Sequence, residues 1–110
     1  MGETSPVVVV ATLVPVAGRE DEVERALRVA VAATHEQDEG CELYALHRVV
    51  RGTAGFVVVE KWASAELLAQ HGSGAAFAEL TKRLDGLLAE PLGVSVLDPL
   101  PAGQAGLGSL

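Results

Sequence analysis

Residues 56–62, Phe-Val-Val-Val-Glu-Lys-Trp, decide the fold that this sequence predicts. β-Branched and aromatic residues favour an extended strand, in which successive side chains point to opposite faces of the sheet. Alternation divides the residues into two sets, one made of Phe56, Val58, Glu60 and Trp62 and the other of Val57, Val59 and Lys61. Each set contains large apolar side chains, so both faces of the sheet need to be covered.

Three further strands are predicted around this one. Apolar and β-branched residues dominate residues 7–14, 41–50 and 92–97. Residues 51–55, Arg-Gly-Thr-Ala-Gly, form a turn of hairpin length that leads into residues 56–62. We therefore expect the strands on either side of this turn to be antiparallel neighbours.

The remaining periodic segments predict helices. Apolar residues recur at helical spacing over about residues 19–37, and Gly40 follows as a residue able to adopt the left-handed conformation that ends helices. Ser64 is suited to cap the start of a short helix over residues 65–71. A glycine-containing break separates this helix from a longer one that is predicted over residues 75–90.

The predicted element order is β-α-β-β-α-β, which is the order of the ferredoxin-like α+β fold. That fold places both helices on one face of a four-stranded antiparallel sheet and leaves the other face open. Because the strand of residues 56–62 is apolar on both faces, we expect an oligomer interface or a ligand cavity, and we predict a homodimer packed sheet to sheet. Residues 1–100 are predicted to form this single domain, with a disordered lead at 1–5 and a flexible tail at 101–110.

Length and charge limit the classes of function. The chain has 110 residues and a formal net charge of -7, from 8 Lys and Arg against 15 Asp and Glu. A single acidic domain of this kind repels phosphate backbones and anionic lipid, so neither nucleic acid nor a membrane surface is an expected partner. The longest apolar runs are shorter than the roughly 20 residues that span a bilayer, and no secretory signal pattern opens the chain, which predicts a cytoplasmic protein.

The residues that most often bind metal ions are few and widely spaced. Cys41 is the only cysteine, and His35, His47 and His71 show no spacing typical of a metal motif. We therefore expect neither an intramolecular disulfide nor a metal site.

Polar and aromatic residues that are unusual for a plain core gather in the two paired strands and the helix that follows. They are Tyr44, His47, Glu60, Trp62 and His71. In this region the chain resembles the antibiotic biosynthesis monooxygenase domain, through the motifs Glu39-Gly-Cys-Glu-Leu-Tyr-Ala-Leu-His47, Phe56-x-x-x-Glu60-x-Trp62-x-Ser64, Leu67-x-x-x-His71 and Phe77. The similarity extends from about residue 7 to residue 97, and the order and spacing of the motifs make it specific to that superfamily.

The resemblance implies a small dimeric α+β barrel in which each subunit holds a pocket between its sheet and its helices. Members of known activity include oxygenases that act on quinols or anthrone-type polyketides without flavin, haem or metal, and also isomerases and haem-degrading enzymes. The fold is therefore shared more widely than the reaction. For this chain the resemblance implies a cofactor-independent monooxygenase that oxidises a small aromatic, quinol or polyketide-type substrate with dioxygen.

The resemblance also implies roles for single residues. A deprotonated phenol or anthrone can itself give an electron to dioxygen, so such an enzyme supplies a base and a dry cavity. His71 would be the base, because histidine has an unperturbed pKa of about 6.5. Glu60 would orient an imidazole or accept a substrate proton, and Trp62 would form an apolar wall whose N–H reaches a quinone oxygen. The residues expected to bind substrate are Tyr44, His47 and Phe77.

The three catalytic candidates each have a structural interpretation as well. His71 would cap the carbonyl groups of a short helix, and Trp62 would pack in the core or in an interface. Glu60 would pair with a basic residue such as Arg48 across the hairpin.

Tyr44 and His47 lie three residues apart in one predicted strand. A regular strand sends side chains at this spacing to opposite faces of the sheet, and only a bulge would let both reach one pocket. We therefore expect at least one of the two to be structural.

The chain departs from the family pattern because it contains no asparagine. Haem-degrading members place an asparagine on the first strand beside a tryptophan and a histidine, and the anthrone oxygenases also use an active-site asparagine with a tryptophan. Neither mechanism carries over intact, which leaves quinol-type oxidation or enol isomerisation. Two alternatives to the oxygenase stay open, namely an isomerase that uses the same acid–base groups and a non-catalytic ligand-binding or dimerisation module.

Overall fold

The computed structural model describes residues 5–110, so most of the lead predicted at residues 1–5 lies outside the described residues. Seven elements follow one another along the chain. The strands are β1 (Val7–Leu13), β2 (Cys41–Arg48), β3 (Phe56–Trp62) and β4 (Gly93–Leu97), and the helices are α1 (Glu20–Gln37), α2 (Ala65–Gly72) and α3 (Ala75–Leu84).

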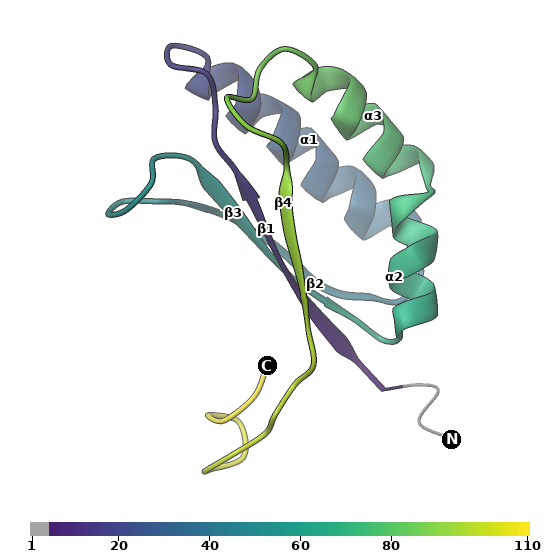
Figure 1. Cartoon of the computed structure of the whole chain (residues 1–110). Coiled ribbons are helices and arrows are strands. Elements are labelled where there is room, and N and C mark those ends of the chain that lie inside the picture. Colours follow the sequence, from purple (N-terminus) through teal and green to yellow (C-terminus); the bar gives the residue numbers. More distant parts are fainter. Residues whose placement is uncertain (1–4) are drawn as a thin grey trace.

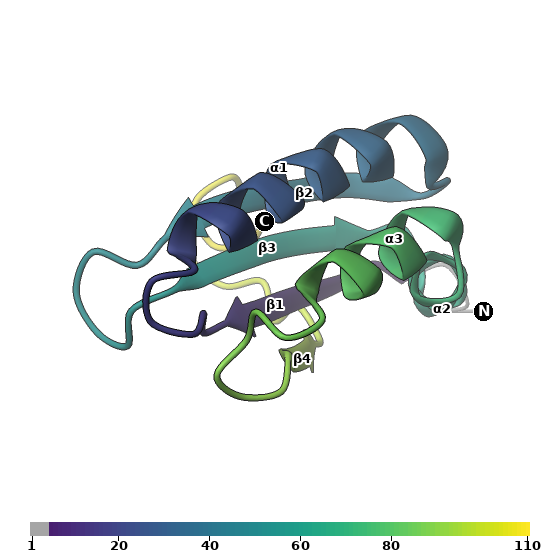
Figure 2. The ribbon, with the colours of Figure 1, turned by 90° about the horizontal axis from the view of Figure 1, so that it is seen from above.

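The four strands form one antiparallel sheet in the order β2-β3-β1-β4 (Figure 1). β2 and β3 are hairpin neighbours, as the turn between them predicts, and β1 pairs with both β3 and β4. All three helices lie over one face of this sheet, as the view from above shows (Figure 2). The ferredoxin-like α+β prediction is therefore confirmed.

The side chains of β3 alternate between the two faces as its sequence predicts. The even-numbered residues from Phe56 to Trp62 are buried beneath the helices, and the odd-numbered residues between them are half-buried. The strand pairing places Glu60 beside Tyr44 of β2 and Val9 of β1. This row of three crosses the middle of the sheet on the side that faces the helices.

The helix predicted over residues 75–90 is wrong at its C-terminal end, because α3 stops at Leu84. Gly86 has a φ of +79°, in the left-handed region, and the chain turns back toward the sheet. Two backbone hydrogen bonds then tie this segment to the end of β1, from the Val16 amide to the Leu87 carbonyl at 2.8 Å and from the Ala89 amide to the Val14 carbonyl at 2.7 Å. Apolar residues beyond Leu84 continue the helical spacing, which is why the sequence predicts a longer helix.

The turn between α1 and β2 brings the end of α1 close to α2. Gly40 has a φ of +83°, and a Cβ atom added there would lie 2.4 Å from Leu67 Cδ1 of α2. Only glycine fits this approach without displacing the Leu67 side chain. Asp38, which precedes this turn, is the C-cap of α1 and contacts α2 through His71.

The start of α2 follows the sequence prediction. Ser64 is its N-cap, and the Ser64 side-chain oxygen accepts a hydrogen bond from the Leu67 amide at 3.2 Å. Residues 73–74 separate α2 from α3, as the glycine-containing break in the sequence predicts. His71 therefore lies in the last turn of a short helix that is fixed at both ends.

The C-terminal residues leave the sheet after β4. The Leu110 carbonyl accepts a hydrogen bond from Lys61 Nζ at 2.8 Å, while the side chains of Leu100 and Leu107 are 83% and 81% exposed. The flexibility of residues 101–110 stays a prediction.

No helix among residues 5–110 has the length and apolar character needed to cross a membrane.

Candidate functional site

A cavity of about 120 Å³ lies between the sheet and the helices. Every strand and every helix contributes to its wall, which is mostly aliphatic. The lining residues include Ala11, Leu13, Val58, Leu68, Phe77 and Leu80, with Tyr44, Glu60 and His71 as the ionisable ones. A pocket at this place is what the family resemblance implies.

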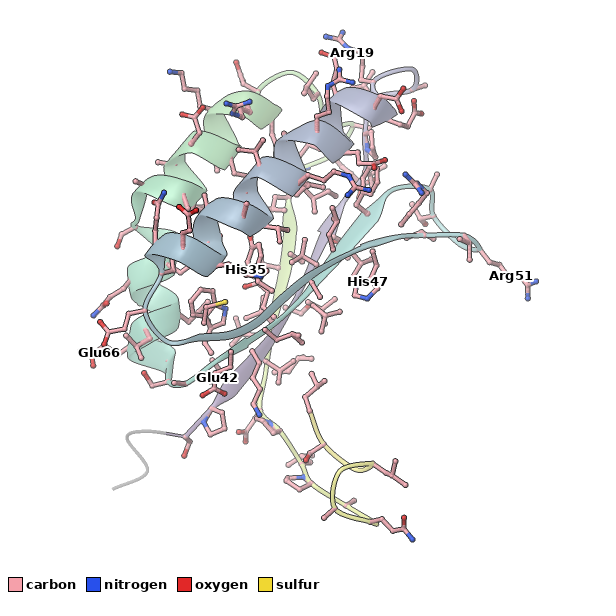
Figure 3. All side chains as sticks on the ribbon, turned by 180° about the vertical axis from the view of Figure 1, so that it is seen from behind. Arg19, His35, Glu42, His47, Arg51 and Glu66 are labelled. Atoms are coloured by element: carbon pink, nitrogen blue, oxygen red, sulfur yellow. The ribbon has the colours of Figure 1, made fainter. Side chains whose placement is uncertain are left out.

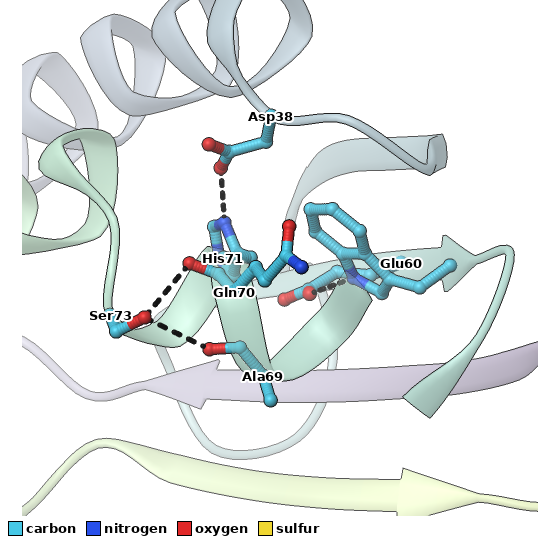
Figure 4. Close-up of polar contacts among 7 residues, drawn as sticks. Asp38, Glu60, Ala69, Gln70, His71 and Ser73 are labelled. Atoms are coloured by element: carbon cyan, nitrogen blue, oxygen red, sulfur yellow. Dashed lines mark hydrogen bonds and ion pairs between the residues drawn. The ribbon is translucent and has the colours of Figure 1, made fainter. Parts of the chain in front are cut away.

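His71 enters this cavity from the last turn of α2. It is 5% exposed, and its Nδ1 atom lies 2.5 Å from Oδ2 of Asp38 at the end of α1 (Figure 4). The two side chains are 33 residues apart in sequence and almost fully buried. The contact joins two helices and leaves the other ring nitrogen, Nε2, without a hydrogen bond to any residue between 5 and 110.

Aromatic rings surround the His71 imidazole. The Trp62 ring lies 4.6 Å from it between centroids, tilted by 32°, while Tyr44 and Phe77 lie at 5.4 Å and 5.6 Å. Offset and edge contacts of this kind are favourable for aromatic pairs. The imidazole is therefore held in one orientation by packing as well as by Asp38.

Glu60 places a carboxyl group in an apolar wall. Its Oε1 atom accepts a hydrogen bond from Trp62 Nε1 at 2.9 Å. Burial raises the pKa of Glu60 above its usual range, although the Trp62 hydrogen bond and the neighbouring His71 act in the opposite direction. A carboxyl group of this kind holds its proton more readily than an exposed glutamate and can then donate a hydrogen bond.

Tyr44 completes the polar part of the wall. Burial, together with the nearby Glu60, raises the pKa of its hydroxyl well above the usual range. The phenol therefore keeps its proton at neutral pH and is a hydrogen-bond donor or acceptor rather than a charge. No lysine or arginine among the described residues lines the cavity, so its polar groups suit an uncharged ligand better than an anionic one.

We expect Glu60→Gln to stabilise the protein by about 1 kcal/mol at pH 8 and to give no gain at pH 4. The pKa of Glu60 is higher in the folded state than in the unfolded state. Wild-type stability therefore falls as the pH rises from the unfolded-state pKa through the folded-state pKa. Glutamine still accepts the Trp62 hydrogen bond but carries no charge to bury. Urea denaturation at the two pH values measures the difference, with the exposed Glu79→Gln on α3 as control. An equal effect of Glu60→Gln at both pH values would contradict the pKa shift.

The structure brings four of the six sequence-predicted site residues to the cavity wall. They are Tyr44, Glu60, His71 and Phe77. Trp62 lies behind them, fully buried, and its N–H is bonded to Glu60 instead of facing the cavity. Its place is that of a core residue which supports both Glu60 and His71.

His47 does not reach the cavity. It is exposed on the opposite side of β2, where its Nδ1 atom lies 3.1 Å from the Ala45 carbonyl (Figure 3). The pairing of β2 with β3 does shift register, but between Cys41 and Leu43, before Tyr44. Tyr44 and His47 therefore stay on opposite faces, as regular alternation predicts.

The ion pair expected between Glu60 and Arg48 is absent. The Arg48 guanidinium instead donates to Glu24 of α1 and lies over the Phe56 ring, 5.9 Å from its centroid. Arg48 lies at the turn end of the hairpin, opposite Phe56, and Glu60 is paired with Tyr44 further along the strand. Among residues 5–110, the Glu60 carboxyl group is hydrogen-bonded to Trp62 and forms no ion pair with a lysine or arginine.

Asp38 is the site residue that the sequence analysis does not identify. It follows a helix and precedes a glycine by two positions, a pattern that indicates a helix end and nothing more. Its partner, His71, comes from a helix that starts beyond two intervening strands.

Within residues 5–110, no group of three or more His, Cys, Asp or Glu side chains is arranged to hold a metal ion.

A family model described as antibiotic biosynthesis monooxygenase matches residues 6–83. No curated protein matches the chain in sequence. Several solved structures have the same fold as the chain. One from Pseudomonas aeruginosa is 26% identical with a TM-score of 0.78, over 89% of this chain and 97% of that chain. One from Mycobacterium tuberculosis is 25% identical with a TM-score of 0.81, over 91% of this chain and 100% of that chain.

A candidate antibiotic biosynthesis monooxygenase from Caulobacter crescentus also shares the fold. It is 24% identical, with a TM-score of 0.81, over 89% of this chain and 92% of that chain. Identity at this level supports the fold and leaves the reaction to be argued from the cavity.

Proposed function

Because the chain belongs to the antibiotic biosynthesis monooxygenase family, we propose that it is a cofactor-independent monooxygenase that oxidises a small hydroxylated aromatic compound with dioxygen. The observation that carries this proposal is the convergence of His71 and Glu60 on one apolar cavity. Burial raises the pKa of Glu60, and an ionisable group with a shifted pKa in a cavity favours catalysis over ligand storage. The same convergence argues against a purely dimerising or ligand-binding module.

The cavity suits substrate deprotonation. Nε2 of His71 accepts the proton of a substrate hydroxyl, and the resulting phenolate is electron-rich enough to give an electron to dioxygen. Glu60 and the Tyr44 hydroxyl, which keeps its proton because burial raises its pKa, hydrogen-bond to substrate oxygens. The aliphatic wall excludes water, which strengthens each of these interactions.

The overall reaction balances without a further reductant. For a hydroquinone, one substrate molecule and one dioxygen give one hydroxyquinone and one water. The O–O bond breaks, one oxygen forms a new C–O bond on the ring, and the other leaves as water with two hydrogens from the substrate. All four electrons taken up by dioxygen come from the substrate.

The size of the cavity favours a substrate with one aromatic ring. Its volume of about 120 Å³ is slightly smaller than that of an engineered cavity of about 150 Å³ that binds benzene. A three-ring anthrone is much larger than this. The absence of a lysine or arginine in the lining also disfavours a phosphate-bearing substrate, and with it a sugar-phosphate isomerase.

Oxygen uptake by the purified protein tests the proposed function. We expect uptake above the autoxidation rate on 1,4-hydroquinone, less on 1,4-naphthohydroquinone and least on anthrone. No uptake on any of the three would overturn the oxygenase. Substrate carbon–hydrogen exchange in D₂O would then identify an isomerase, and ligand binding without exchange would identify a binding module.

We also propose that a second copy of the chain covers the open face of the sheet. Val59 lies at the centre of this face, between Val10 of β1 and Ala45 of β2, and all three are half-buried. Lys61 and Glu42 lie beside them, with Lys61 Nζ 3.8 Å from Glu42 Oε1. The face therefore carries both signs of charge and matches a twofold-related copy of itself. Two such faces pack as the sheets of a sandwich do.

Sedimentation at micromolar concentration tests this interface. We expect the wild-type protein to be a dimer and Val59→Glu to be a monomer, because a carboxylate at the centre of the interface would lose its hydration. Val29→Glu is the matched control, since Val29 is a 45% exposed valine on α1, on the helix side of the molecule. A monomeric wild type, or a dimer that survives Val59→Glu, would contradict the sheet-to-sheet arrangement.

A further inference from the structure

The structure points to a positioning role for Asp38 that rests on the proposed function of His71. We propose that Asp38 fixes His71 in one tautomer, with the proton on Nδ1 and the lone pair of Nε2 facing the cavity. Asp38 would thereby decide which nitrogen of the imidazole can accept a proton from a substrate. It would act through His71 and would not touch the substrate, because Asp38 is not among the residues that line the cavity.

The first support is the contact itself. An ionised carboxylate can only accept hydrogen bonds, so a neutral imidazole at 2.5 Å from Asp38 Oδ2 must donate from Nδ1. A neutral imidazole with its proton on Nδ1 has an unprotonated Nε2. The side chains of His71 and Asp38 are only 6% and 11% exposed, so water competes weakly for this hydrogen bond.

The second support is that the backbone holds Asp38 in place. Its amide donates to the Thr34 carbonyl at 3.1 Å, which ends α1, and the close approach of Gly40 to Leu67 fixes the turn that follows. On the other side, a Cβ atom added to Gly74 would lie 3.6 Å from Asp38 Oδ1. The carboxylate is therefore confined between the end of α1 and the junction of α2 with α3.

The third support is that His71 has no competing partner. Nδ1 bonds to Asp38, and no side chain or carbonyl between residues 5 and 110 bonds to Nε2. The Trp62, Tyr44 and Phe77 rings hold the imidazole and oppose its rotation. The ionisable groups around His71 are Asp38 from the end of α1, Glu60 from β3 and Tyr44 from β2, and only Asp38 is hydrogen-bonded to it.

A purely structural tie between α1 and α2 is the competing interpretation of this contact. It predicts that loss of the Asp38 charge lowers stability and leaves the imidazole chemistry unchanged. The positioning role predicts a change of tautomer even when the fold is intact. Asp38→Asn separates the two, because asparagine keeps the shape and can either accept from Nδ1 or donate to it.

The experiment is nitrogen-15 NMR of the His71 imidazole, assigned by the signal lost in His71→Gln. We expect one tautomer protonated at Nδ1 in the wild type, and a mixture with the Nε2-protonated form in Asp38→Asn. We also expect kcat to fall about 10- to 100-fold with little change in KM. The control is Asp85→Asn, the same change at the C-cap of α3, which should alter neither tautomer nor kcat.

The outcomes are distinguishable from failure of the proposed function. A wild-type imidazole protonated at Nε2, or a tautomer that does not change in a folded Asp38→Asn, would overturn the role of Asp38 whatever the activity. An Nδ1 tautomer that is lost in Asp38→Asn, in a protein that consumes no oxygen, would support the positioning role and overturn only the oxygenase.

Discussion

His71→Ala is expected to lower the rate of substrate oxidation by about 10²- to 10⁴-fold, the usual contribution of one positioned base. Among the described residues, His71 is the only histidine on the cavity wall, and its Nε2 atom has no protein partner there. The remaining lining groups bind and orient substrate: burial raises the pKa of the Tyr44 hydroxyl, which keeps its proton, and the Glu60 carboxyl group accepts a hydrogen bond from Trp62. Tyr44 is therefore no replacement as the proton acceptor, and Glu60 already has a hydrogen-bond partner.

Oxygen uptake by His71→Ala and by His47→Ala, compared with the wild type, measures this effect. His47 lies exposed on the opposite side of β2, so its alanine variant should keep the wild-type rate. Circular dichroism establishes that His71→Ala is folded, because a small void is left beside Trp62. A folded His71→Ala variant with full turnover would remove His71 from the mechanism.

Trp62→Ala is expected to lower the free energy of unfolding by about 3–5 kcal/mol. Trp62 is 0% exposed, packs against both His71 and Tyr44, and donates the hydrogen bond that satisfies Glu60. Its removal leaves a cavity and also a buried carboxyl group without its donor. We expect the two losses to reinforce each other because they act at the same place.

Urea denaturation followed by circular dichroism measures this change, since the chain has no other tryptophan to report by fluorescence. Trp62→Phe is the informative companion, because it keeps one aromatic ring and loses the N–H together with part of the indole. It should cost less than Trp62→Ala and still disturb Glu60. A loss below about 1 kcal/mol in Trp62→Ala would show that Trp62 does not hold the core together.

The strands and the start of each helix could be predicted because local periodicity determines them. Residues 56–62 alternate between faces in the structure as they do in the sequence, and Ser64 caps α2 as its residue type predicts. The end of α3 could not be predicted in this way. Apolar residues after Leu84 keep the helical spacing, while two hydrogen bonds to the end of β1 decide the actual conformation.

Strand alternation and family resemblance predict only part of the candidate site. They identify Glu60, His71 and Tyr44, which share the cavity wall. His47 matches a family motif and yet lies outside the cavity. The position of a residue along the strand decides which face of the sheet its side chain is on, and His47 falls on the face away from the helices. Asp38 was missed because its contact with His71 joins two helix ends that no sequence spacing connects.

The most direct test of the central claim is the fate of the oxygen atoms in ¹⁸O₂. The protein is incubated with 1,4-hydroquinone under labelled dioxygen, and the product is trapped before its carbonyl oxygens exchange with water. We expect one labelled oxygen in each hydroxyquinone product, at a rate that depends on His71. A product without label, with the labelled oxygen recovered as hydrogen peroxide, would contradict it, because the protein would then only promote autoxidation.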